Sequence, residues 1–155
     1  MNKRLYIAYG SNLNKEQMAL RCPNAKPIAV GTLKDYRLVF QGHPYGAHAN
    51  VIPAKGHEVP VAVWEITEKD EANLDIYEGV RGGYYTKEYT NIQVNGEYRP
   101  ALIYIMTPNP YGRPADHYLQ TIAEGYVAFN LPIKALNDAV IHARENTPEI
   151  NRMAR

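Results

Sequence analysis

The stretch that decides the fold is VPVAVWEITEKDEANLDIYEGVRGGYY, residues 59–85. Its first eight residues are β-branched and almost wholly apolar, which is typical of a buried strand. Thr67 then begins a helix, because Asp70 three residues later completes a variant of the capping box and Gly79 suits the helix end. The pattern therefore predicts a strand followed by a helix that ends at an acid, Glu78.

The flanking sequence extends this unit in both directions. Asn95-Gly96 between two alternating runs is a strong hairpin signal, and Pro132 suits the first turn of a helix. Apolar residues at helical spacing give two C-terminal helices one buried face each, Leu119, Ile122 and Tyr126 in one and Ile133, Leu136 and Val140 in the other. The sequence predicts an α+β fold with a largely antiparallel sheet. The predicted strands are 4–9, 26–33, 35–42, 59–66, 86–94 and 98–107. The predicted helices are 15–22, 67–77, 115–130 and 132–145, and the predicted loops are 42–50, 53–58 and 108–114.

Length and composition bound the class of protein. A chain of 155 residues predicts one domain, 1–155. Seventeen basic and sixteen acidic residues give a net charge of +1 without long runs of one sign, so we expect neither a nucleic-acid nor a membrane partner, but a small molecule. Cys22 is the single cysteine, which excludes an internal disulfide and suits a reducing compartment. The N-terminal apolar run is too short for a signal peptide, and we expect a cytoplasmic protein.

Glu78 is the first candidate for chemistry. The C-terminal end of a helix carries partial negative charge, which disfavours an acid there. On a solvated surface this mismatch would have little consequence. If the side chain is partly buried, desolvation and the dipole both raise its pKa, and the carboxylate becomes a better base near neutral pH.

The second candidate is YGSN, residues 9–12, where a predicted strand turns into a helix. Such a turn can direct successive backbone N–H groups at an anionic oxygen, or it can be a plain capped turn. The motif matches neither the dinucleotide nor the P-loop fingerprint. Ser11 is the only serine and lacks the Gly-x-Ser-x-Gly elbow of a hydrolase. The five histidines do not fall at a recognised metal spacing, and we expect no metal.

Taken together, YIAYGSNL near the N-terminus and LDIYEGVRGGYY in mid-chain resemble the γ-glutamylcyclotransferase family, which includes AIG2-like members. The family pattern has a Tyr-Gly-Ser-Asn-Leu loop after the first strand and a later Leu-Asp-x-x-Glu-Gly segment followed by a tyrosine. The matching residues here are Tyr9, Gly10, Ser11, Asn12 and Leu13 in the loop, and Leu74, Asp75, Glu78, Gly79 and Tyr85 in the later segment.

The resemblance implies a small mixed, largely antiparallel β-barrel with flanking helices and an enzyme that needs no cofactor. The loop Tyr9 to Leu13 would hold a γ-glutamyl group, Glu78 would be the single acid/base, and Tyr85 would shape the pocket. The reaction would convert a γ-glutamyl amine or peptide into 5-oxoproline and a free amine. Some members carry a tyrosine shortly after a Leu-Pro pair, but Ile133, Lys134 and Ala135 follow that pair here, so the substrates of those members do not transfer.

Two other functions fit the same residues. A binding module of this fold would keep the pocket and turn over little substrate. A related transfer or hydrolytic enzyme would act on a different γ-glutamyl amide and release free glutamate. Residues 42–50 and 107–117 are the segments expected to line the outer pocket, and the sequence predicts no particular oligomeric state.

Overall fold

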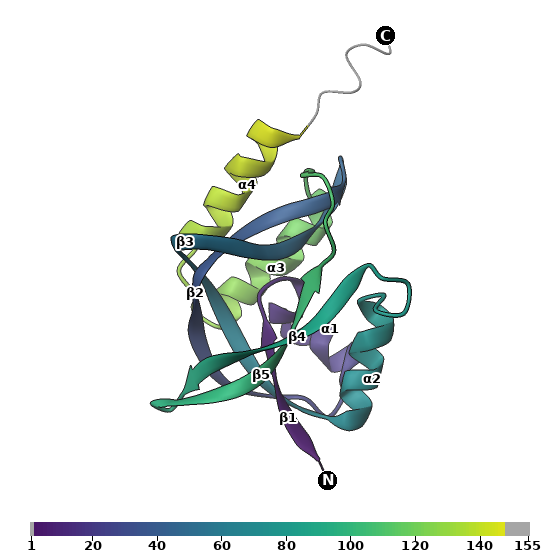
Figure 1. The fold of residues 1–155 in the computed structure, drawn as a ribbon, viewed down its shortest axis with the longest axis vertical. Coiled ribbons are helices and arrows are strands. Elements are labelled where there is room, and N and C mark those ends of the chain that lie inside the picture. Colours follow the sequence, from purple (N-terminus) through teal and green to yellow (C-terminus); the bar gives the residue numbers. More distant parts are fainter. Residues whose placement is uncertain (1, 148–155) are drawn as a thin grey trace.

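One mixed sheet and four α-helices make up the fold in the computed structural model, which describes residues 2–147 (Figure 1). The strands are β1 (Lys3–Ala8), β2 (Lys26–His43), β3 (Gly46–Thr67), β4 (Tyr85–Val94) and β5 (Glu97–Met106). The helices are the 3₁₀ turn η1 (Ser11–Leu13), α1 (Lys15–Arg21), α2 (Glu68–Tyr77), α3 (Asp116–Ala128) and α4 (Lys134–Asn146). The predicted α+β fold is confirmed.

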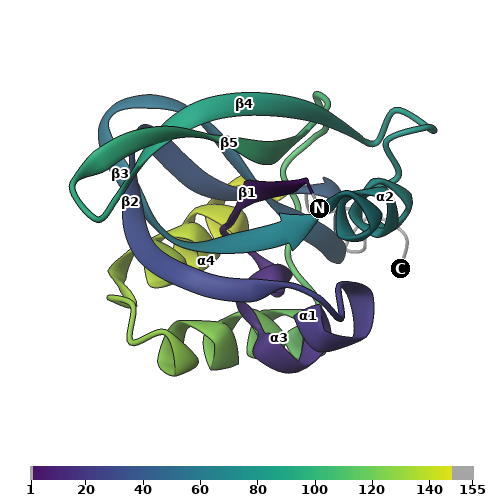
Figure 2. The ribbon, with the colours of Figure 1, turned by 90° about the horizontal axis from the view of Figure 1, so that it is seen from below.

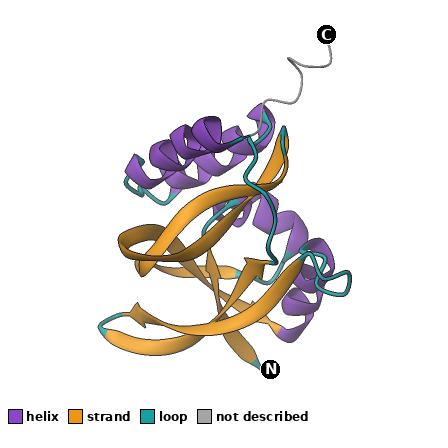
Figure 3. Ribbon diagram, turned by 45° about the horizontal axis from the view of Figure 1, so that its top comes forward, coloured by secondary structure: helices purple, strands orange, loops and turns teal. Residues whose placement is uncertain are grey.

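The sheet has the strand order β2-β3-β1-β5-β4. All neighbours are antiparallel except β1 and β5, which are parallel. The sheet curves strongly (Figure 3), but within residues 2–147 its edges β2 and β4 are not joined by a ladder of hydrogen bonds. Instead they meet through packing: a Cβ on Gly31 of β2 would lie 3.6 Å from Ile92 Cδ1 of β4. The expected barrel is therefore an open sheet whose edges only pack together.

The first two long strands differ most from the sequence-based expectation. The pairing of β2 with β3 shifts register between Lys34 and Tyr36, which pair with Glu58 and Pro53. Asp35 and Gly56 have positive φ at this bulge, and Asp35 Oδ1 accepts a hydrogen bond from the Gly56 N–H at 3.0 Å. The residues that predicted a break thus form a bend inside one long hairpin. The predictions of loops at 42–50 and 53–58 were wrong, because Gly42 and His43 belong to β2 and residues 46–67 all belong to β3.

The other local signals are mostly confirmed. Thr67 and Asp70 form a complete capping box at the start of α2. Asn95 and Gly96 both have positive φ, as a tight hairpin turn requires. Helix α4 begins at Lys134, so Pro132 precedes the helix instead of lying in its first turn, and Ile133 is 44% exposed.

Strands and helices pack around β1 to form the core. Ile7 of β1 and Ile122 of α3 are fully buried, as is Leu13 at the end of η1. Figure 2 shows the β4–β5 hairpin and helix α3 on opposite sides of β1. The C-terminal end of β1 therefore meets elements from both sides, and the turn after it lies at their junction.

Candidate active site

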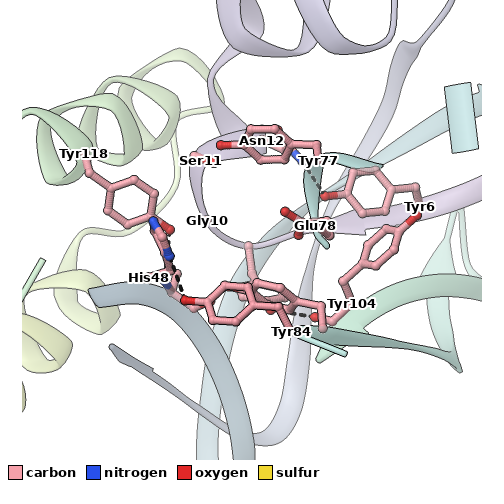
Figure 4. Close-up of a pocket in the computed structure, with 13 residues that line it drawn as sticks. Tyr6, Gly10, Ser11, Asn12, His48, Tyr77, Glu78, Tyr84, Tyr104 and Tyr118 are labelled. Carbon is pink, nitrogen blue, oxygen red and sulfur yellow. Dashed lines mark hydrogen bonds between the residues drawn. The ribbon is translucent and has the colours of Figure 1, made fainter. Parts of the chain in front are cut away.

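Glu78 is placed by the end of helix α2. It is the C-cap residue, and its N–H donates to the Leu74 carbonyl at 2.8 Å. Gly79 follows with φ +65°, a left-handed conformation that glycine adopts without strain and that commonly ends a helix. A Cβ at Gly79 would also lie 3.2 Å from Tyr84 Cβ, so the chain doubles back tightly here. The helix end and this glycine turn direct the Glu78 carboxylate into a cavity (Figure 4).

The cavity has a volume of about 260 Å³ and lies where seven elements or their connections converge. Seven of its thirteen lining residues are tyrosines, here called the cavity tyrosines: Tyr6, Tyr9, Tyr77, Tyr84, Tyr85, Tyr104 and Tyr118. The other six are Gly10, Ser11, Asn12, His48, Ala49 and Glu78. Glu78 is thus the one carboxylate in a wall of aromatic rings and a glycine-containing turn.

Several tyrosine hydroxyls are fixed by hydrogen bonds to the protein. Tyr9 donates to the Tyr104 carbonyl at 2.6 Å. Tyr85 donates to the Ala49 carbonyl at 2.7 Å, and the Ala49 N–H donates to Tyr118 Oη at 2.9 Å. These bonds join the turn after β1 to β5 and tie β4 and α3 to the same residue of β3. The cavity wall is therefore held in shape before any ligand enters.

The turn after β1 forms one side of the cavity. The Leu13 and Asn14 N–H groups donate to the Gly10 and Ser11 carbonyls at 2.9 and 3.0 Å, which closes the 3₁₀ turn. The first N–H groups of such a turn lack acceptors within it, and these belong to residues that line the cavity. Gly10 packs against Ala49, since a Cβ at Gly10 would lie 3.0 Å from Ala49 Cβ.

Burial sets the electrostatics of the site. It raises the pKa of Glu78 to about 7, while the nearby Arg21 guanidinium opposes the shift. The Tyr84 pKa is raised by burial and then by the negative charge of Glu78. His48 Nδ1 lies 2.8 Å from Tyr84 Oη, and burial lowers the pKa of its imidazole. A carboxylate with a pKa near neutrality can both accept and return a proton at physiological pH.

The structure brings most of the sequence-predicted residues together. Glu78, Tyr9, Gly10, Ser11, Asn12 and Tyr85 all line the cavity. Leu13 does not: it is fully buried, and a Cβ at Gly125 of α3 would lie 2.6 Å from it. Leu13 anchors the turn from behind. Within residues 2–147, no group of three or more His, Cys, Asp or Glu side chains is arranged to hold a metal ion.

Several other residues of the cavity were not predicted as site residues. Tyr6, Tyr77, Tyr104 and Tyr118 come from four different elements, and His48 belongs to the segment 42–50, which was expected to line the outer pocket. The composition is a weak sign of such a wall, because thirteen tyrosines stand against two phenylalanines and one tryptophan, and tyrosine suits walls that are apolar on one side and wet on the other. A second cavity of about 370 Å³ adjoins the first and shares Ser11, His48, Tyr77 and Tyr118 with it.

Fold and site together define a class: a small α+β domain in which a tyrosine-lined cavity holds one acid opposite a Gly-Ser-Asn turn. Comparison with known proteins agrees. The family model described as gamma-glutamyl cyclotransferase, AIG2-like, matches residues 6–126, and the chain belongs to this family.

Individual relatives support the same assignment. The chain is 33% identical to a gamma-glutamylcyclotransferase of Bos taurus over 84% of its own length and 73% of the bovine protein. The Homo sapiens gamma-glutamylcyclotransferase is 32% identical over the same shares. A solved structure named gamma-glutamyl cyclotransferase superposes with a TM-score of 0.79 at 27% identity, covering 96% of this chain and 90% of the other.

Proposed function

We propose that this single domain is a γ-glutamyl cyclotransferase that converts a γ-glutamyl amine or peptide into 5-oxoproline and a free amine. The relatives that it matches over most of their length carry this enzyme name. The observation that carries the proposal is the position of Glu78, which enters a cavity bounded on another side by Gly10, Ser11 and Asn12. No helix of residues 2–147 has the length and apolar character needed to cross a membrane.

The reaction is an intramolecular acyl transfer. The substrate's α-amine nitrogen attacks its own γ-carbonyl carbon, the bond from that carbon to the departing nitrogen breaks, and a five-membered lactam forms. The attacking nitrogen must lose a proton, and the departing nitrogen must gain one. Glu78 takes the first proton and supplies the second. Its pKa of about 7 lies close to that of an α-amine, roughly 8, so neither transfer is steeply uphill.

The cavity wall orients the substrate for this attack. Holding two reacting groups in a near-attack geometry is worth about 7 to 11 kcal/mol relative to a loosely held pair. The N–H groups at the start of the turn after β1 are suited to the substrate carboxylate or to the oxyanion that develops at the γ-carbonyl, where losing one donor typically costs roughly 3 kcal/mol. The cavity tyrosines exclude water around the folded-back substrate.

The departing amine would lie toward the second cavity. Its lining includes Gly46 and Ala47 from one of the segments expected to form the outer pocket, and Ala115 and His117 from the other. The leaving group would extend past His48, which lines both cavities.

The test is product analysis with purified protein and a panel of γ-glutamyl amines and peptides. We expect 5-oxoproline to be released without added metal, and Glu78→Gln to remain folded but lose activity by about 100- to 10,000-fold, in line with removal of an acid/base group. Glu88→Gln is the matched control, because Glu88 is exposed on β4 outside the cavity. Free glutamate as the product would indicate hydrolysis, and ligand-induced stabilisation without turnover would indicate a binding module. An active Glu78→Gln variant would refute the mechanism.

A further inference from the structure

Arg21 is the last residue of helix α1 and lines the second cavity behind the turn after β1. Its guanidinium donates to Ser11 Oγ at 3.2 Å, to Gln17 Oε1 at 2.7 Å, and to Asn12 Oδ1. It also donates to Tyr77 Oη and lies over the Tyr77 ring, 3.4 Å from the ring centre. One side chain thus contacts α1, the turn and the end of α2.

These contacts connect the two halves of the site. Ser11 and Asn12 belong to the turn, whereas Tyr77 directly precedes Glu78. Asn12 also contacts the cavity wall, because its Nδ2 donates a hydrogen bond to Tyr6 Oη at 2.8 Å and Tyr6 lines the cavity. A planar guanidinium with several donors can hold such partners in one fixed arrangement, which a single ammonium group cannot.

We propose that Arg21 is a positioning residue for the reaction: it holds the Ser11–Asn12 turn at a fixed distance from Glu78 and places a positive charge in the neighbourhood of the carboxylate. The role rests on the proposed function, since it concerns the same turn and the same acid.

The effect of the Arg21 charge on Glu78 depends on which other titratable groups surround the carboxylate. The cavity tyrosines come from β1 and the turn after it, α2, the segment before β4, β4 itself, β5 and α3, and tyrosine hydroxyls ordinarily lose their proton only near pH 10. His48 from β3 is an exposed residue whose pKa is lowered by partial desolvation. Arg21 therefore supplies the positive charge that persists at neutral pH, and it opposes the effect of burial on the Glu78 pKa.

The experiment compares Arg21→Gln, Arg21→Lys and Arg81→Gln. Arg81 is an exposed cation three residues beyond Glu78, so it controls for loss of charge near the acid without loss of the contacts. For each variant, the ¹³C chemical shift of the Glu78 carboxyl is followed with pH by NMR, the melting temperature is measured, and kcat/KM for 5-oxoproline release is measured from pH 5 to 9.

For Arg21→Gln we expect a higher titration midpoint of Glu78, an acidic limb of the pH–rate profile displaced in the same direction, and a fall in kcat/KM of about 10- to 100-fold. Arg21→Lys should keep the titration midpoint close to that of the unmodified protein but recover only part of kcat/KM, because it keeps the charge and loses the forked contacts. Arg81→Gln should change neither the titration midpoint of Glu78 nor kcat/KM.

An unchanged Glu78 midpoint in Arg21→Gln, with any loss of activity matched by a lower melting temperature, would overturn the proposal. So would full recovery of kcat/KM in Arg21→Lys, since geometry would then play no part. The NMR titration does not require turnover, and it would still report whether Arg21 acts on Glu78 if the protein released no 5-oxoproline. Failure of the proposed function and failure of this inference are therefore distinguishable.

Discussion

Tyr104 of β5 donates a hydrogen bond from its hydroxyl to Asp75 Oδ1 of α2 at 2.7 Å. Asp75 Oδ2 in turn lies 3.0 Å from the Lys87 ammonium group of β4. Asp75 belongs to the Leu-Asp-x-x-Glu-Gly segment, but it is not among the residues that line the cavity, whereas Tyr104 is. The aspartate of the motif therefore acts on the site indirectly, by fixing a tyrosine of the wall.

This relationship predicts different results for two substitutions of Asp75. Asp75→Asn keeps an oxygen that can accept from Tyr104 and should cost less than about 1 kcal/mol, because the ion pair that it removes is partly exposed. Asp75→Leu leaves a buried hydroxyl without its acceptor, which costs about 1 to 3 kcal/mol, and should lower kcat/KM as the wall shifts. Urea unfolding and 5-oxoproline release measure the two effects. Equal effects of the two substitutions would show that the Tyr104 bond is unimportant.

The raised pKa of Glu78 predicts a pH-dependent effect on stability. Burial raises this pKa from 4.5 to about 7, so between these values the folded state binds a proton that the unfolded state has released. Stability must then fall as the pH rises through this range. Glu78→Gln carries no such charge and should be more stable than the unmodified protein at pH 8 by about 1 to 3 kcal/mol, allowing for partial exposure of the side chain.

The two proteins should be equally stable at pH 4, where the carboxyl is largely protonated in both the folded and the unfolded state. Denaturant unfolding at pH 4, 6 and 8 measures the difference. Glu88→Gln, which changes an exposed acid, should show no comparable trend. A Glu78→Gln variant that is less stable than the unmodified protein at pH 8 would contradict the assignment of a carboxylate whose pKa is raised by burial.

Tyr9 illustrates how a cavity residue can act through its ring alone. Its hydroxyl is committed to the Tyr104 carbonyl, and the side chain is buried. Tyr9→Phe should therefore cost about 1 to 2 kcal/mol of stability, through the lost hydrogen bond, and change kcat/KM less than tenfold. Tyr98→Phe on the exposed β4–β5 hairpin is the control. A large loss of activity without a loss of stability would instead mean that the Tyr9 hydroxyl contacts the substrate.

The elements that sequence analysis predicted correctly are those whose signals are local. The capping box of Thr67 and Asp70 and the Asn95-Gly96 turn depend on residues within a few positions of one another. The bulge between β2 and β3 also contains typical turn residues. Whether Asp35 and Gly56 end their strands or only bend them is decided by the contact between the two residues across the hairpin. That pairing spans 21 residues and leaves no periodic trace in the sequence.

The site shows the same division. The turn after β1 and Glu78 lie in short motifs, which is why they could be proposed together. Tyr9 and Tyr85 lie in the same motifs, but Tyr6, Tyr77, Tyr104 and Tyr118 cannot be recognised in this way, because each lies in a strand or helix where tyrosine is equally common as a structural residue. Only the sheet order, with β1 between β3 and β5, brings Tyr6 and Tyr104 together edge to face, with their ring centres 5.8 Å apart.

The contact between Gly125 and Leu13 gives a final prediction that connects packing to the site. A Cβ at Gly125 would lie 2.6 Å from the Leu13 carbonyl carbon, too close for real atoms, so α3 would have to move away from the turn. An exposed Gly→Ala change in a helix stabilises by about 1 kcal/mol, but here overpacking should prevail and Gly125→Ala should destabilise by about 1 to 3 kcal/mol. Because α3 also carries Tyr118, kcat/KM should fall.

Val127→Ala, at a 79% exposed position of the same helix, should be neutral or slightly stabilising. Thermal unfolding of both variants decides the matter: a Gly125→Ala variant more stable than the unmodified protein would mean that helix propensity outweighs this contact and that the turn does not depend on it.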